Sequence, residues 1–312
     1  MEETAASETV CANCGAVLAG EFCGQCGQRR FAERDRRFGH LLRQLFEAAT
    51  DLDGRFWRSL RALMLRPGLI PADYIRGRRA CWMSPLSLFL FANVLFFFAP
   101  GVSDLTLELE QQVPEPVLRE FRTPEQNAAR QVHGRQLHNA LTAPLARVAL
   151  TQARDRARRQ GQAFDLEVYA AEYHARSDAI GKLLVFVHVP CIALVLQLLA
   201  WRSRRYFAEH FVLALTLMAF TMLFVQVVVM PCAYLYLQAR TALGLTPELM
   251  PDWAKIGLVL VNIGYFSRAC WRCYASPAWL ALLQGFGAFA ALAISSLFVY
   301  RGLQLLFTLW SV

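Results

Sequence analysis

The stretch Ser84–Pro100, SPLSLFLFANVLFFFAP, decides the fold class of this chain. It forms the centre of an almost wholly apolar run from Met83 to Val102. About twenty apolar residues are enough for one α-helix to cross the hydrocarbon of a bilayer. Pro85 suits the first turn of such a helix, and Pro100 with Gly101 suits its exit. The run therefore predicts a transmembrane helix at residues 83–102.

Four further apolar blocks follow and predict an all-α membrane protein with five spans; they are Leu183–Trp201, Phe211–Leu237, Ile256–Ala269 and Ala278–Tyr300. Of the 312 residues, 56% are hydrophobic, whereas soluble domains hold roughly 45–50% apolar residues. The block at Ile256–Ala269 is the weakest, since it contains Asn262 and Gly264, so a four-span variant with this block re-entrant stays open. Residues 183–312 thus hold four spans and an apolar tail, Gly302–Val312, which we expect on the outer membrane surface.

The polar segments predict which side of the membrane each part faces. Residues 29–80 and the loop Arg202–Arg205 are rich in arginine, which favours the cytoplasmic side. With five spans, residues 103–181 then lie on the extracytoplasmic side of the membrane as a small α-helical domain. Its charges nearly cancel, and it carries no catalytic motif.

The basic segment 29–80 predicts a collar of two amphipathic helices at the membrane surface. One covers residues 38–49. The second places Phe56, Trp57, Leu60, Leu63 and Met64 on one face and Arg55, Arg58, Arg61 and Arg66 on the other. Such arginines suit contacts with anionic lipid headgroups. Positive-inside topology would explain the same arginines without specific lipid recognition.

Two C-x-x-C-G knuckles near the N-terminus, CANCGAVLAGEFCGQCG, give the most specific chemical signal. Their cysteines, Cys11, Cys14, Cys23 and Cys26, predict a structural zinc ribbon at residues 11–28, because four thiolates complete a tetrahedral shell and leave no open position. Residues 1–10 are expected to be a disordered tail. Thiolates that hold metal need a reducing compartment, which agrees with a cytoplasmic N-terminus. Glu21 is the one charged side chain between Cys11 and Cys26, so the ribbon favours docking to a protein over binding nucleic acid.

Polar residues within the apolar blocks form a second candidate site; they are Asn93, His188, Gln226 and Asn262. Such residues are costly in hydrocarbon and face other helices or a water path. The simpler interpretation, which we favour, is hydrogen bonding between helices. The pair Cys270 and Cys273 is interpreted as a coincidence rather than a redox or metal site. No nucleotide-binding, hydrolase or metalloprotease fingerprint is present, so a non-enzymatic role is favoured.

The stretch Leu63–Phe98, LMLRPGLIPADYIRGRRACWMSPLSLFLFANVLFFF, follows a ribbon that ends in Cys26-Gly27-Gln28. In this it resembles an uncharacterised bacterial membrane family, catalogued only as a domain of unknown function, in which a zinc ribbon precedes such a stretch and several spans. The resemblance implies an inner-membrane location and no reaction.

Together these features predict a membrane-anchored scaffold or regulatory protein whose cytosolic ribbon docks a protein partner. The alternative is a transporter or channel for a small solute or lipid that uses the polar residues within the spans. The sequence leaves a homo-oligomer open.

Overall fold

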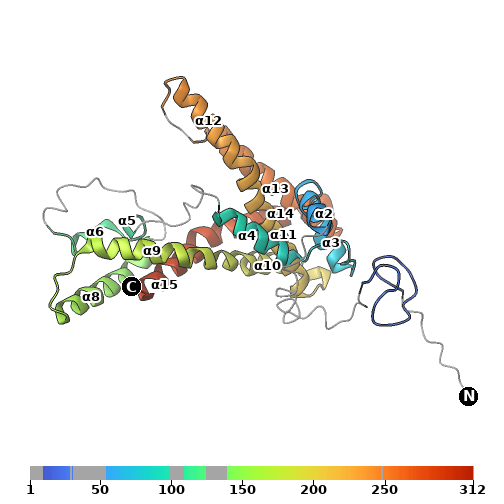
Figure 1. Cartoon of the computed structure of the whole chain (residues 1–312), viewed down its shortest axis with the longest axis horizontal. Helices are drawn as coiled ribbons and strands as arrows, with labels where there is room; N and C mark the ends of the chain where they lie inside the picture. Colours follow the sequence, from blue (N-terminus) through green and yellow to red (C-terminus); the bar gives the residue numbers. More distant parts are fainter. Residues whose placement is uncertain are drawn as a thin grey trace, which may run out of the picture. The chain divides into compact units, whose positions relative to one another are not determined.

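A computed structural model of the chain describes residues 10–28, 30, 54–98, 109–123, 139–246 and 249–311 (Figure 1). All the regular elements in these ranges are helical, and their one β feature is an isolated antiparallel bridge between Val10 and Val17. The chain divides into two compact units. The first combines Met1–Ala99 with Val189–Ala291, and the second combines Pro100–His188 with Leu292–Val312.

Within the described residues, three helices are long and apolar enough to cross a membrane: Leu166–Leu199, Phe207–Ala242 and Ala278–Ser311. They contain 34, 36 and 34 residues. At a rise of 1.5 Å per residue, 34 residues extend about 50 Å, well beyond a hydrocarbon core of about 30 Å. The prediction of an all-α membrane protein is therefore confirmed in outline. Helix α4 (Pro85–Phe98) is apolar but shorter, so the count of five spans stays a prediction.

The first unit is built around α11 (Phe207–Phe224), which is buried along most of its length. It packs against α2 (Gly54–Leu65), α3 (Leu69–Ile75), α4 and α13 (Asp252–Tyr274). A π-helical turn, η4 (Val225–Val229), joins it to α12 (Met230–Ala242). The remaining helices of this unit are α10 (His188–Leu199), the short 3₁₀ turn η3 (Trp201–Ser203) and α14 (Ala278–Ile294).

Helix α4 starts where the sequence predicts. The backbone N–H of Ser87 donates to Ser84 Oγ at 3.0 Å, so Ser84 caps the helix and Pro85 occupies its first position. A proline costs little there, because the first N–H of a helix has no partner within the helix.

Helix α2 buries part of the face that hydrophobicity predicts, together with Ser59 and Ala62. Its buried residues are Phe56, Ser59, Ala62 and Leu63, whereas Trp57 is 68% exposed. Ser59 is buried because its hydroxyl accepts a hydrogen bond from the backbone N–H of Met83 at 2.9 Å. Among the arginines, Arg58, Arg61 and Arg66 are exposed and Arg55 is half-buried. The predicted helix at residues 38–49 and the tail at residues 1–9 lie outside the described residues.

The turn Arg66-Pro67-Gly68 ends α2 and sets α3 against α13. Proline cannot continue a helix, and Gly68 adopts a left-handed φ of 72°. A Cβ on Gly68 would lie 2.7 Å from both Cα and O of Ala269 in α13. Arg272 also donates to the carbonyl of Pro67 at 2.9 Å. The turn therefore needs glycine both for its φ and for the close approach of two backbones.

The second unit contains α5 (Leu109–Gln112), α6 (Glu115–Arg119), α8 (Asn139–Arg159), α9 (Leu166–Leu184) and the 3₁₀ turn η2 (Val185–Val187). The C-terminal part of the chain adds the π-helical turn η5 (Ser295–Tyr300) and α15 (Arg301–Ser311), which lies beside α8 and α9 (Figure 1). Leu305 and Leu309 of α15 join the buried core formed by α5, α6, α8 and α9. The apolar tail that we expected on the outer membrane surface lies in helix α15, which packs against residues of the 103–181 segment.

Candidate metal centre

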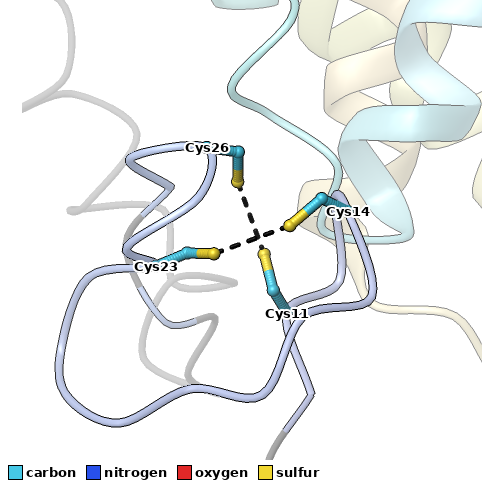
Figure 2. Close-up of side chains that lie close together, drawn as sticks. All are labelled: Cys11, Cys14, Cys23 and Cys26. Atoms are coloured by element: carbon cyan, nitrogen blue, oxygen red, sulfur yellow. Dashed lines mark hydrogen bonds between the residues drawn. The ribbon is translucent and has the colours of Figure 1, made fainter.

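The four N-terminal cysteines converge on one point, as Figure 2 shows. All four sulfur atoms lie within 4.8 Å of one another; Cys11 Sγ is 3.6 Å from Cys26 Sγ, and Cys14 Sγ is 3.5 Å from Cys23 Sγ. A tetrahedral shell with Zn–S bonds of about 2.3 Å separates its sulfurs by roughly 3.8 Å. A disulfide would place two sulfurs about 2.05 Å apart, and these cysteines are free. The geometry therefore fits one tetrahedral metal ion.

Backbone hydrogen bonds explain why each knuckle needs its C-x-x-C-G spacing. The N–H of Gly15 donates to the carbonyl of Cys11 at 2.9 Å, and the N–H of Gly27 donates to that of Cys23 at 2.8 Å. Both glycines adopt a left-handed φ, 79° at Gly15 and 70° at Gly27. Side chains disfavour this conformation. Each glycine thus closes a turn that directs two thiols to the same side.

Two of the four thiols, Cys11 and Cys23, have lowered pKa values, which favours the thiolate form that binds a cation. Backbone N–H groups of Cys26 and Gln25 point at the Cys23 thiol and lower its pKa to about 6. The pKa of Cys11 is lowered in the same way by the N–H groups of Cys14 and Asn13. At Cys14 the N–H of Ala16 acts in the same direction, but desolvation and the neighbouring thiols outweigh it and raise the pKa to about 12. Four adjacent thiolates therefore need a bound cation to balance their charge.

The outer surface of the ribbon is apolar. Val10, Val17 and Phe22 are 56%, 61% and 62% exposed, respectively. Val10 and Val17 are neighbours, because they pair across the isolated bridge. Glu21 is the one charged side chain among residues 10–28. Several large apolar side chains exposed on so small a module are typical of an interaction surface.

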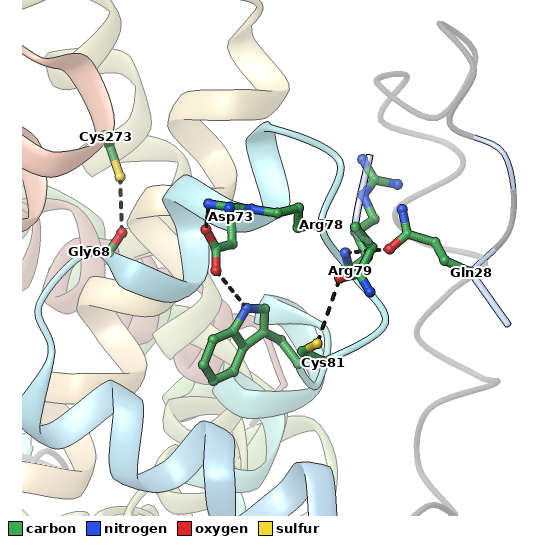
Figure 3. A network of polar contacts seen from close by, with 9 residues as sticks. Gln28, Gly68, Asp73, Arg78, Arg79, Cys81 and Cys273 are labelled. Atoms are coloured by element: carbon green, nitrogen blue, oxygen red, sulfur yellow. Dashed lines mark hydrogen bonds and ion pairs between the residues drawn. The ribbon is translucent and has the colours of Figure 1, made fainter. Parts of the chain in front are cut away.

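Gln28, directly after the second knuckle, holds the ribbon to the loop between α3 and α4 (Figure 3). Its Oε1 accepts from the backbone N–H groups of Arg79 at 3.0 Å and Ala80 at 3.1 Å, and its Nε2 donates to the carbonyl of Gly77. The side chain is buried. A second contact comes from the first knuckle, where Asn13 Oδ1 accepts from Cys81 Sγ at 3.6 Å.

The same loop is tied to α3 through Asp73. The buried carboxylate of Asp73 pairs with the guanidinium of Arg78 and accepts from Trp82 Nε1 at 3.0 Å (Figure 3). The guanidinium of Arg79 lies over the ring of Tyr74, 4.3 Å from its centroid. These contacts fix the chain between the end of α3 and the start of α4. The bonds from Gln28 to this loop join residues 49 to 52 positions apart, and no local sequence signal predicts them.

The four polar residues of the second candidate site have separate surroundings. Asn262 accepts from Thr221 Oγ1 at 3.1 Å and donates to the carbonyl of Leu258 at 2.9 Å, as expected for bonding between and within helices. His188 belongs to the other unit, where its Nδ1 lies 2.8 Å from Ser295 Oγ. Asn93 Nδ2 and Gln226 Oε1 are buried without a hydrogen-bond partner.

His188 is the first of a row of polar contacts, called here the polar seam, that joins α9 and the start of α10 to η5 and α15 and that the sequence analysis does not predict. Ser295 lies in η5, Tyr300 donates to the carbonyl of Gly181 at 3.3 Å, and Gln304 Nε2 donates to Ser177 Oγ at 2.9 Å. The sequence does contain a signal for this seam. In the last predicted span and the tail, polar residues recur four or five positions apart, a spacing that places them on one face of a helix.

Cys270 and Cys273 are buried side chains of α13. Cys273 Sγ donates to the carbonyl of Gly68 at 3.6 Å. Within the described residues, the N-terminal cysteines form the one group of three or more potential metal ligands.

The family model described as "Protein of unknown function (DUF3667)" matches residues 53–97. The match spans α2, α3, the loop that Gln28 contacts and nearly all of α4. It covers a small part of the chain, which is similar to the family there. No curated protein and no solved structure matches the chain.

Proposed function

We propose that this chain is a membrane-anchored scaffold or regulatory protein whose ribbon docks a protein partner. The exposed group Val10, Val17 and Phe22, called here the ribbon patch, is the observation that carries the proposal. An apolar surface with almost no charge suits a protein surface that is also apolar, and it offers phosphate groups no cation. The ribbon is small, so a bound metal would supply most of the free energy that shapes this patch.

The metal proposed is Zn²⁺, held by Cys11, Cys14, Cys23 and Cys26. Four thiolates in a closed tetrahedron suit Zn²⁺ and give it a structural role. The proposed setting is a bacterial inner membrane with the ribbon in the reducing cytosol. This setting is supported by the thiol chemistry and by the arginines of α2, which suit the headgroups of the inner leaflet.

Crosslinking and co-purification from native membranes would test the docking role. The test variant is Val17→Ser/Phe22→Ser, and the matched control is Gln25→Ala, which alters an exposed polar residue of the same ribbon. We expect the test variant to lose a crosslinked partner that the wild type and the control retain, with metal content unchanged in all three. Identical crosslinking in all three would refute the proposal. A partner released steeply by salt would point to charged contacts instead.

A transporter or channel is the second candidate. Two candidate spans contain π-helical turns, η4 at Val225–Val229 and η5 at Ser295–Tyr300, and such turns are frequent at functional sites. The unpartnered Oε1 of Gln226 lies in η4. Flux in reconstituted vesicles that is lost in Gln226→Ala and kept in Gln238→Ala, an exposed control, would favour this function. Absence of flux in wild-type vesicles would remove it.

A further inference from the structure

Gln28 connects the ribbon to the α3–α4 loop of the first unit. Its backbone is fixed by the ribbon, and its side chain bonds to the loop. It follows Cys26 by two residues, and its backbone carbonyl accepts from the N–H of Cys23 at 2.9 Å. Closing the second knuckle therefore places Gln28. The amide at the end of its side chain then bonds three backbone groups of the α3–α4 loop, those of Gly77, Arg79 and Ala80.

The bonds to Gln28 use both ends of the amide. Its oxygen takes two backbone N–H groups, and its nitrogen gives a hydrogen to a carbonyl. Side chains that satisfy buried backbone groups of a loop restrict its opening, because each group would otherwise need water or another partner. The far side of the loop is held by Asp73 through Arg78 and Trp82, and that contact belongs to α3 rather than to the ribbon.

Residues 10–28 contain two buried cysteines and no other buried apolar side chain. Without metal, a segment with so little core loses the free energy that keeps its knuckles closed. The carbonyl of Gln28 would then lose its hydrogen bond from Cys23. The backbone from which the Gln28 side chain extends would no longer be held in place. Metal binding is thus linked to the backbone groups of Gly77, Arg79 and Ala80 through Gln28, whereas Asn13 of the first knuckle contacts the same loop at Cys81.

We infer that Gln28 couples the metal state of the ribbon to the α3–α4 loop, which is clamped when the metal is bound and released when the metal is lost. This inference rests on the metal site of the proposed function. It makes the ribbon a metal-responsive clamp on the segment that leads into α4. Removal of the metal would release the loop from Gln28 while Asp73 still holds its other side.

Amide hydrogen exchange of the full-length protein in nanodiscs tests the inference. Peptides covering residues 76–84 are compared with Zn²⁺ bound and after chelation, with metal content measured on the same samples. In the wild type, chelation should speed exchange of the Arg79 and Ala80 amides by roughly tenfold or more. In Gln28→Ala, these amides should already exchange fast with metal bound, and chelation should add little. The control Gln25→Ala should behave as the wild type.

A second variant separates the clamp from a general folding defect. Gln28→Glu keeps an acceptor for the N–H groups of Arg79 and Ala80 but removes the donor to Gly77, so its exchange should lie between those of the wild type and Gln28→Ala. Wild-type protein that binds metal but shows no change in the loop on chelation overturns the inference alone. Wild-type protein that binds no metal overturns the metal site as well. Metal-loaded Gln28→Ala with wild-type protection also overturns the clamp.

Discussion

Replacing Gly68 by alanine should be among the most damaging single-methyl changes in this chain. A left-handed φ of 72° costs an alanine about 1–2 kcal/mol. The new Cβ would also lie 2.7 Å from the backbone of Ala269, where neither partner is a flexible side chain. Overpacking of this kind costs typically about 1–3 kcal/mol. The sum, about 2–5 kcal/mol, is a large share of the roughly 5–15 kcal/mol that stabilises a typical domain.

Two glycine controls separate the two contributions. Gly161 has a φ of 70° with no atom within 4 Å of the added Cβ, so Gly161→Ala should cost about 1–2 kcal/mol from the backbone alone. Gly257 lies in α13 with an ordinary helical φ and open space, so Gly257→Ala should stabilise by about 0.5–1 kcal/mol. Denaturation in detergent micelles, followed by circular dichroism, measures all three. Equal losses for Gly68→Ala and Gly161→Ala would refute the contact between the turn and α13.

Three further predictions concern the metal, the C-terminal helix and the polar seam. Cys23→Ser should lower bound zinc from about one equivalent to near none, measured by elemental analysis after dialysis; full retention would remove the four-thiolate site. Leu305→Ala should lower the free energy of unfolding by about 2–5 kcal/mol and make the second unit sensitive to protease, because Leu305 is buried. Leu306→Ala, at a 43% exposed position, should change little. Equal protease sensitivity of the two variants would contradict the packing of α15. A double-mutant cycle of His188→Ala and Ser295→Ala should give a coupling of about 0.6 kcal/mol and at most about 1.7 kcal/mol, the average and the maximum found for hydrogen bonds between membrane helices; additive effects would mean that the bond contributes nothing.

The sequence predicts those features that depend on neighbouring residues. The four thiols converge because each C-x-x-C-G turn is closed within five residues, at Cys11–Gly15 and Cys23–Gly27. Likewise, Ser84 and Pro85 mark the start of α4 by local chemistry alone.

The sequence does not predict contacts that depend on tertiary packing. Hydropathy places a span at Leu183–Trp201, but the helix extends from Leu166 to Leu199, since a helix continues through polar residues that a hydropathy window excludes. The apolar face predicted for α2 does not include Ser59, which is buried and accepts a hydrogen bond from the backbone of Met83, 24 positions away, whereas Trp57 of that face is exposed. The clamp by Gln28 joins residues 49 to 52 positions apart, which no local pattern encodes.

Helix α15 also affects how this protein is made. The second unit combines Pro100–His188 with Leu292–Val312, so about a hundred residues must be synthesised between the two parts of its core. At 5–20 residues per second, ribosomes need roughly 5–20 s for that interval. During this time the core side chains of α5, α6, α8 and α9 lack Leu305 and Leu309 as partners. The apolar core of the nascent unit therefore stays incompletely covered until the last helix emerges, and premature termination near the C-terminus would leave it so.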